Sequence, residues 1–375
     1  MTSKFVLLAP FAGLAILAIS AMPTSAQIVQ TTAVPFLQIE PDSRAAGMGM
    51  TGVGIADNAS ALFWNPAGLA GQTGAEVSFT HAPWLPALGA DLSYEYLAGK
   101  YFVEGIGTFA GHLTYLNLGE QERTDAQGNV LGTFKSYDLA VGGSYGTNIT
   151  ETLSVGTGLR LIYSNLAGGV EVEGQETRAG VAVGVDLGVL WSPQVGDGKF
   201  EPHLGLNLAN MGPTIQYSDS EQADAIPTNL RFGGAVDANL DEYNTVTWAV
   251  DFNKLLVDRK DDGSYAPFYE AIFSSWGSVD VDLNPNDGEA NPESVSALRQ
   301  LTLGTGLEYW YSDLFALRTG YFYEDPANGN RKFLTFGAGL RYSLVGVDLS
   351  YIYALEENSP LAEQIRFSVM LNIDR

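Results

Sequence analysis

The chain has no cysteine among its 375 residues, which excludes a disulfide framework and a lipid-modified N-terminal cysteine. Basic residues are scarce: 19 Lys and Arg face 43 Asp and Glu, giving a formal net charge of −24 at pH 7. Because phosphate binding requires clustered cations, we expect no nucleic-acid partner. We interpret the acidic stretches 219–224 and 280–293 as solvated loops.

Long apolar runs are absent except at the N-terminus. Lys4 precedes an apolar run over residues 5–21, and Pro23-Thr24-Ser25-Ala26 follows it. This order of charge, apolar core and small residues predicts a signal peptide over residues 1–26, cleaved after Ala26. No other stretch approaches the roughly 20 consecutive apolar residues that a membrane-spanning helix needs. We expect an exported protein without a helical anchor.

From Ala75 onward, apolar residues alternate with small or polar ones. In residues 181–191 the odd positions are Val, Leu or Trp, and the even positions up to 188 are Ala, Gly or Asp. A period of two predicts β-strands. Aromatic residues stand near the ends of such segments, as at Tyr309, Tyr311, Tyr342 and Tyr353. An apolar outer band with aromatic girdles around a polar lumen is typical of a membrane barrel.

The connections between these segments alternate in length. Short links are expected near residues 146–150, 239–243, 312–313 and 344–345. Long links are expected at 119–132, 167–177, 211–227, 256–299, 325–330 and 356–361. Outer-membrane barrels sort periplasmic turns and extracellular loops in this way, whereas a soluble β-sandwich has no reason to do so. We predict an all-β fold, a transmembrane antiparallel β-barrel of about 14 strands over residues 75–375, in the outer membrane.

Residues 27–74 precede the first strand and differ from it. The stretch 35–69 is rich in Gly and mixed in period, and residues 60–69 resemble a short amphipathic helix interrupted at an Asn-Pro step. We predict a plug in the barrel mouth. Its candidate residues are Arg44, Gly47, Gly49, Trp64, Asn65 and Pro66. The alternative is a loop and small helix at the start of any globular domain.

The link over residues 256–299 is much longer than a barrel loop needs to be. An aromatic stretch at 266–277 precedes an acidic run and a segment, 292–299, that we expect to be helical. Exposed aromatic residues in an external loop indicate a docking surface. The candidate partner- or cargo-binding residues are Phe268, Tyr269, Ile272, Phe273 and Trp276. A cap over the barrel rim that buries its own aromatic residues is an equal alternative.

Two patterns resemble ligand sites, one for a dinucleotide and one for calcium, but neither matches its motif fully. Residues 47–52 match the glycine pattern of dinucleotide sites, but no βα context precedes them. Residues 280–291 space oxygen ligands like a calcium loop, but Pro285 stands where an EF-hand needs Gly and Asn291 where it needs Glu. We expect neither a cofactor nor a metal.

Catalysis has little support in the sequence. Of the three histidines, His112 and His203 fall on expected strands and His81 at the first loop. No nucleophile-elbow sequence accompanies any of them. We interpret all three as lumen or rim residues and expect no enzyme, although an outer-membrane acyl hydrolase is conceivable.

Four stretches carry a resemblance to a known family. They are PFLQIEPDSRAAGMG (35–49), ALFWNPAGLA (61–70), IFSSWG (272–277) and LRTGYFYED with NGNRKFLTFGAGLRY (317–325 and 328–342). In these the chain resembles the PorV family, the outer-membrane channel proteins of the bacterial type IX secretion system, and more distantly FadL-type fatty-acid transporters. The ending Ile373-Asp374-Arg375 departs from the aromatic residue on which barrel proteins often finish.

The resemblance implies a plugged fourteen-stranded barrel without enzymatic activity. It implies binding of the C-terminal signal domain of secreted cargo beside a large translocon barrel (SprA or Sov type), and transfer to a sortase-like attachment complex (PorU type). It also implies contact with the lipid bilayer and lipopolysaccharide. The residues of the aromatic loop would contact the translocon. The alternative, a FadL-like transporter of hydrophobic small molecules, needs a continuous apolar cavity in the lumen.

Overall fold

The computed structural model describes residues 32–88, 91–124, 129–169, 171–172, 175–196, 198–218, 223–260, 262–282, 292–357 and 359–373. The expected signal peptide lies outside these residues, and so does most of the acidic stretch 280–293. No helix in the described ranges has the length and apolar character that crossing a membrane requires.

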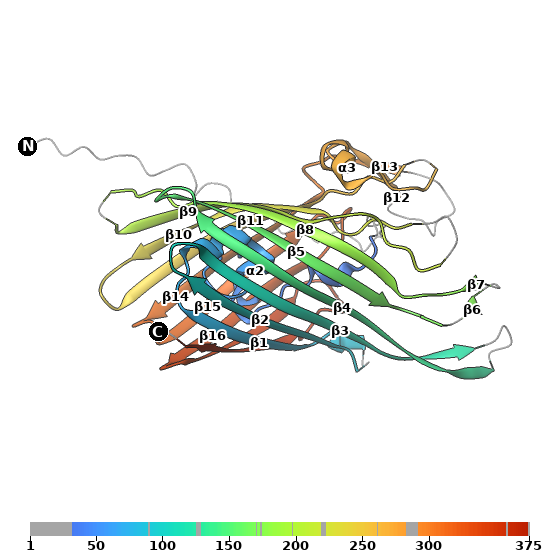
Figure 1. Cartoon of the computed structure of the whole chain (residues 1–375), viewed down its shortest axis with the longest axis horizontal. Coiled ribbons are helices and arrows are strands. Elements are labelled where there is room, and N and C mark those ends of the chain that lie inside the picture. The colour runs from blue at the N-terminus through green and yellow to red at the C-terminus, as the bar shows by residue number, and fades with distance from the viewer. Residues whose placement is uncertain are drawn as a thin grey trace, which may run out of the picture.

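Antiparallel strands close into one barrel (Figure 1), which confirms the predicted fold class and strand number. The barrel strands are β1 Ala75–Pro83, β2 Ser93–Val103, β3 Gly107–Thr124, β4 Val130–Asn148, β5 Leu153–Asn165, β8 Gly180–Trp191, β9 Phe200–Met211, β10 Asn229–Asn239, β11 Asn244–Leu255, β14 Leu301–Tyr311, β15 Phe315–Glu324, β16 Lys332–Tyr342, β17 Val345–Ala354 and β18 Ile365–Asn372. Each pairs with its neighbour along the chain, and β1 pairs with β18 to close the ring.

Two small hairpins and six helical turns complete the described elements. The hairpins pair β6 Glu171–Val172 with β7 Gln175–Glu176, and β12 Val279–Asp282 with β13 Pro292–Val295. The helical turns are η1 Pro35–Gln38, α1 Ser43–Gly47, α2 Ala61–Trp64, η2 Pro66–Gly71, η3 Pro86–Leu88 and α3 Phe268–Ser274.

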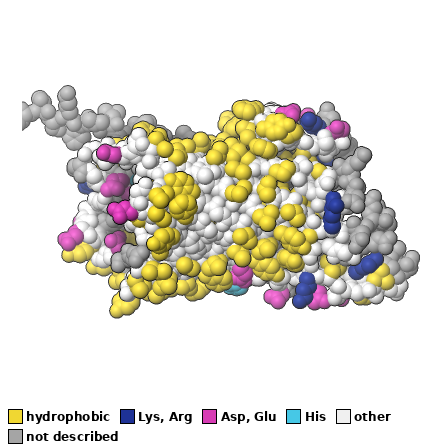
Figure 2. Space-filling view, in the orientation of Figure 1, with side chains coloured by type: hydrophobic (Ala, Val, Ile, Leu, Met, Phe, Trp, Pro, Cys, Tyr) yellow, Lys and Arg dark blue, Asp and Glu magenta, His cyan; other side chains and the backbone are white. Residues whose placement is uncertain are grey.

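The two faces of the wall follow the predicted alternation. In β8, Val181, Val183 and Leu187 are exposed, whereas Gly184 and Asp186 are buried. The exposed set is the apolar one, as a wall against lipid requires, and Figure 2 shows apolar side chains spread over it. The predicted aromatic girdle positions include Tyr311, Tyr342 and Tyr353, all exposed near strand ends.

Three local predictions are wrong. The expected loop 119–132 consists largely of strand, because β3 and β4 continue to pair as a hairpin although their residues there are polar. The expected helix 292–299 begins instead with β13, where Val295 pairs with Val279 and is buried. His81 lies on β1, between Glu95 of β2 and Phe367 of β18, and not in the first loop. In each case long-range strand pairing overrides the local pattern.

Residues 32–74 run through the inside of the barrel (blue in Figure 1). At one end the backbone N–H of Ala33 donates to the carbonyl of Ala225, in the long connection between β9 and β10. At the other end the N–H of Phe102 donates to the carbonyl of Gly74, beside the short turn between β2 and β3. The segment therefore connects the long-loop end to the short-turn end. We call residues 32–74 the lumen segment.

Candidate functional site

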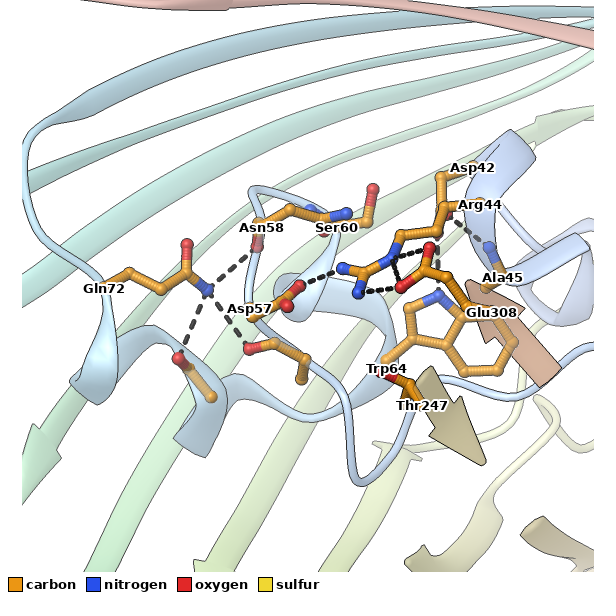
Figure 3. A network of polar contacts seen from close by, with 12 residues as sticks. Asp42, Arg44, Ala45, Asp57, Asn58, Ser60, Trp64, Gln72, Thr247 and Glu308 are labelled. Carbon is orange, nitrogen blue, oxygen red and sulfur yellow. Dashed lines mark hydrogen bonds and ion pairs between the residues drawn. The ribbon is translucent and has the colours of Figure 1, made fainter. Parts of the chain in front are cut away.

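The first helix of the lumen segment is held by its N-cap. Asp42 has extended backbone angles, and its Oδ1 accepts from the N–H of Ala45 at 2.8 Å, the arrangement that starts a helix. Its Oδ2 accepts from the indole N–H of Trp64 at 2.9 Å (Figure 3), which ties α1 to α2. Ser43 contacts the wall, with its Oγ 2.8 Å from the Oγ of Ser368.

Both predicted plug glycines, Gly47 and Gly49, lie against the wall. Gly49 has φ +69°, and a Cβ added there would lie 2.3 Å from the carbonyl oxygen of Thr305. Its N–H donates to the hydroxyl of Thr335 at 2.8 Å, and that hydroxyl donates to the carbonyl of Gly47 at 2.9 Å. Only glycine combines this backbone angle with so close an approach.

A buried ion-pair network joins the lumen segment to the barrel wall (Figure 3). Arg44 donates to both oxygens of Glu308, with Nη2–Oε1 at 2.7 Å and Nε–Oε2 at 2.9 Å. Its Nη1 also pairs with Asp57, whose side chain is 60% exposed. Glu308, on β14, has a fully buried side chain and accepts a further bond at 2.5 Å from the Nε of Arg318.

The network continues along the lumen face of the wall. Arg318 of β15 donates from Nη1 to Asp348 of β17 at 2.7 Å, and Arg341 of β16 donates to the other oxygen of Asp348 at 2.7 Å. Both guanidinium groups lie over the ring of Trp310, at 5.4 and 5.2 Å from its centroid. Opposite charges alternate along this chain of contacts, so each buried charge has a partner, as burial requires.

The Asn-Pro step fixes the turn between α2 and η2. Asn65 is extended (φ −165°, ψ 105°) and its Oδ1 accepts from the N–H of Ala67, so it caps η2. Its side-chain amide donates to the carbonyl of Val189 in β8 at 2.9 Å. Pro66 packs directly on Gly156 of β5, where an added Cβ would lie 2.2 Å from the carbonyl carbon of Pro66.

A small polar cavity lies on the long-loop side of Trp64. It has a volume of about 30 Å³, and its lining includes Phe63, Arg231 and Asp251. Asp251 accepts from the N–H groups of Gly52 and Val53 through Oδ2, and the Arg231 guanidinium lies 4.1 Å from the Phe63 ring centroid. One water needs about 10–15 Å³, so the cavity has room for about two.

The long loop over residues 256–299, between β11 and β14, carries α3 (Figure 1). Phe273 is 80% exposed and Tyr269 64% exposed, whereas Phe268 and Ile272 are half-buried. Phe268 and Tyr269 pack edge to face, with ring centroids 5.6 Å apart. The predicted docking residues thus divide into two that face outward and others that pack within the loop.

Trp276 has a different position from the rest of this set. Its indole N–H donates to the carbonyl of Ile272 at 3.0 Å, and the ammonium group of Lys254 lies 5.5 Å from its ring centroid. Lys254 is buried at the long-loop end of β11 and donates to Gln300 at 2.7 Å. Gln300 in turn donates to the carbonyl of Gly277 at 3.0 Å. Trp276 therefore lies where the loop joins the wall.

A second contact fixes the end of this loop. Arg299 donates from Nε and Nη2 to the two oxygens of Asp325, both at 3.0 Å, and also pairs with Glu293. The hydrogen bonds to Asp325 and Glu293 raise the pKa of the Arg299 guanidinium above its ordinary value, so this group stays charged at any physiological pH.

A tyrosine fixes the connection between β9 and β10 in a similar way. The hydroxyl of Tyr217 donates to Ser164 of β5, and burial raises the pKa of Tyr217 to about 12.

The three histidines occupy three environments. His81 faces outward and its Nδ1 lies 2.7 Å from Glu95. His112 faces the lumen and stacks on Tyr96. His203, near the short-turn end, has its Nδ1 2.8 Å from the Oγ of Ser192 and its Nε2 3.3 Å from Asp237. The nitrogen order is opposite to that of serine hydrolases, in which Nε2 contacts the serine.

A model of a known family matches residues 22–262, and it is described as type IX secretion system protein PorV. The chain belongs to the PorV family. PorV proteins are known for a role in secretion and not as enzymes. Family membership and the closed barrel together place the protein in the outer membrane, as predicted, within type IX secretion. No curated protein matches the chain.

Solved structures similar to this PorV-family chain are barrels of the same kind. The Pseudomonas putida toluene transporter TodX aligns with a TM-score of 0.54 and 13% identity, over 90% of this chain and 99% of that one. A TodX deltaS2S3 mutant, a monoaromatic hydrocarbon channel, aligns with 0.52 and 14%, over 88% and 98%. A Pseudomonas aeruginosa FadL homologue aligns with 0.43 and 12%, over 88% and 98%. At these identities the TodX likeness supports the fold alone.

The sequence predicts residues of the lumen segment such as Arg44, but not their charged partners on the wall. Glu308, Arg318 and Asp348 stand at lumen-facing positions of otherwise apolar or Gly-rich strands. A charged residue at a lumen-facing position is the one sequence feature that indicates such a network, because a charge buried in the lumen is tolerated only when it is paired. Which charges meet depends on strand register. The predicted plug residues lie together in the lumen; their role, and that of the α3 residues, stays a prediction.

Proposed function

We propose that this protein receives the C-terminal signal domain of secreted cargo at its extracellular rim, beside a large translocon barrel, and passes it to the attachment complex. The observation that carries the proposal is α3, which presents Phe273 and Tyr269 to solvent from a loop fixed to the wall through Lys254 and Arg299. Large apolar side chains held outward on an ordered support favour binding of another protein.

The lumen segment supports this function by acting as a plug. Its network through Arg44 and Glu308 ties it to the wall. The cavity beside Trp64 is small, about 30 Å³, and a second one between Leu37 and His112 is smaller still, about 10 Å³. A filled barrel keeps the membrane sealed while its rim takes part in protein transfer. The role of the lumen segment as a plug is itself part of this proposal.

The conduit alternative has weaker support. The fold is shared with a toluene transporter, and such a transporter needs an apolar cavity of a few hundred Å³. In this lumen the larger of the two cavities is lined by Arg231, Asp251 and Asn253 as well as aromatic residues. Recovery of the protein with a fatty acid or another apolar ligand bound, and without protein partners, would favour the conduit.

The test is purification of the tagged protein from native membranes in mild detergent, with the variants Phe273→Asp and Leu298→Asp. Leu298 is a matched control, since it is 78% exposed in the same loop but outside α3. We expect Phe273→Asp to fold, because its side chain is in water, but to lose the translocon barrel and to reduce cargo secretion. Leu298→Asp should retain both. Retention of both by Phe273→Asp contradicts the assignment of α3.

A further inference from the structure

The barrel wall is uneven at its long-loop end, because β3 and β4 are longer than their neighbours. β2 begins at Ser93, opposite Asn117 of β3, and β5 ends at Asn165, opposite Tyr137 of β4. The β3–β4 ladder continues beyond both, through the pair Glu120–Lys135 to Arg123–Gly132. In Figure 1 this extension projects at the lower right.

Within the described residues, the extension pairs in no ladder other than its own. Residues 120–123 of β3 face residues 132–135 of β4. In an antiparallel pair, alternate N–H and C=O groups point away from the partner strand. Each strand of the extension therefore offers one edge of main-chain donors and acceptors toward solvent.

The two edges differ in how they are protected. The β3 edge reads Glu-Gln-Glu-Arg over 120–123 and follows a bulge at Leu118–Gly119, where Gly119 has φ +76°. Charges and bulges are the devices with which natural sheets block strand addition. The β4 edge reads Gly-Thr-Phe-Lys over 132–135, with one charge and no proline. Its own bulge is at Leu131, beside Gly132 (φ +146°), and residues 133–135 pair in regular register with β3.

The β4 edge is also open. Residues 130–133 are exposed, and in the described part of the chain no atom other than those of its sequence neighbours lies within 4 Å of the place where a Cβ on Gly132 would stand. Leu131 and Val130, at the tip, are large apolar residues in water, exposed by 56% and 59%. The edge lies at the same end of the barrel as α3.

We propose that residues 132–135 of β4 bind an extended strand of the cargo signal domain by β-strand addition. The inference rests on the proposed function and names the surface that the cargo meets. A row of unsatisfied main-chain groups is complementary to another strand, which supplies the missing donors and acceptors. Specificity then comes from alternate side chains, with Thr133 and Lys135 on one face and Phe134 on the other.

Paired proline variants test the edge. Thr133 faces Glu122 and Phe134 faces Gln121, so the two members of each pair direct their N–H groups alike, both inward or both outward. Proline removes the N–H and blocks addition. Of residues 133 and 134, one directs its N–H outward and the other directs it toward β3. Proline at the residue with the outward N–H, as Thr133→Pro or Phe134→Pro, should weaken binding by about tenfold or more. Its partner variant on β3, Glu122→Pro or Gln121→Pro, should bind like the unsubstituted protein.

The probe is a purified C-terminal signal domain of one type IX cargo fused to a fluorescent protein, titrated against the full-length barrel in detergent. Binding to the unsubstituted protein together with equal binding to all four proline variants overturns the edge inference and leaves the proposed function standing. Absence of binding to the unsubstituted protein overturns both. Folding of each variant is checked by its heat-dependent shift in gel mobility.

The absence of cysteine permits a second measurement that does not depend on proline. Single cysteines at 132, 133, 134 and 135 are combined with single cysteines along one strand of the signal domain. Strand addition predicts that the best cross-linking partner moves by one residue for each step along β4. A partner position that does not move, or cross-links between two copies of this chain in place of the cargo, overturns the proposal.

Discussion

Glu308 is the residue on which we expect attachment of the lumen segment to depend most. It has a fully buried side chain and accepts hydrogen bonds from both Arg44 and Arg318. Replacing it with Gln leaves Arg44 paired with the exposed Asp57. Arg318 and Arg341 then share one carboxylate, that of Asp348. The buried network then carries one uncompensated positive charge.

The expected costs follow from this charge balance. Removing one partner of a buried ion pair costs about 3–5 kcal/mol, which we expect for Glu308→Gln. Arg44→Met leaves Glu308 paired with Arg318 and frees only Asp57, which water solvates, so we expect about 1–3 kcal/mol, the range for a lost charged hydrogen bond. Asp57→Asn should cost less than about 1 kcal/mol, as exposed pairs do.

The assay is urea unfolding of the purified barrel in detergent, followed by its heat-dependent gel mobility, together with limited proteolysis of the lumen segment. We expect the order Glu308→Gln, then Arg44→Met, then Asp57→Asn in both the loss of stability and the rate of cleavage. Equal effects of the first two variants, or a larger effect of Arg44→Met, would refute the charge-balance reasoning.

The other predictions concern single contacts. Gly49→Ala places a Cβ 2.3 Å from the carbonyl of Thr305 at a positive φ, so we expect a loss of about 1–3 kcal/mol in urea unfolding, and a smaller loss would show that the segment can shift. Lys254→Met removes the bond to Gln300 and the cation over Trp276, so we expect faster proteolysis of the loop but unchanged barrel unfolding; unchanged proteolysis would contradict the role of Lys254.

The barrel was predictable because the membrane imposes a simple rule on its strands. A wall between lipid and lumen must alternate, and β8 does so at every position from Val181 to Val189. The rule stops where the strands leave the membrane. Residues 119–124 of β3 are polar and alternate in no clear way, since both faces there meet water, and the sequence alone therefore suggested a loop.

The site was predictable only in part, for a related reason. The Gly-rich, Pro-broken stretch around Asn65 signals a segment that packs closely against something, and its location in the lumen is consistent with that. Glu308 and Asp348, the wall-side carboxylates of the network, lie 264 residues or more after Arg44 in the sequence. Which charges meet depends on strand order and register. Trp276 is exposed, as the sequence predicts for this aromatic stretch, but the sequence does not show that the buried Lys254 lies against its ring.

The seam between β1 and β18 has a consequence for the order of assembly. These are the first and the last strands of the barrel along the chain, so the ring cannot close until β18 has been exported. The hydroxyl of Ser368 in β18 lies within hydrogen-bond distance of both Thr80 of β1 and Ser43 of α1. The last pairing to form thus brings together both edges of the ring and the chain inside it. Closure of the wall and filling of the lumen therefore share one side chain, because the hydroxyl of Ser368 contacts both the first strand and the lumen segment.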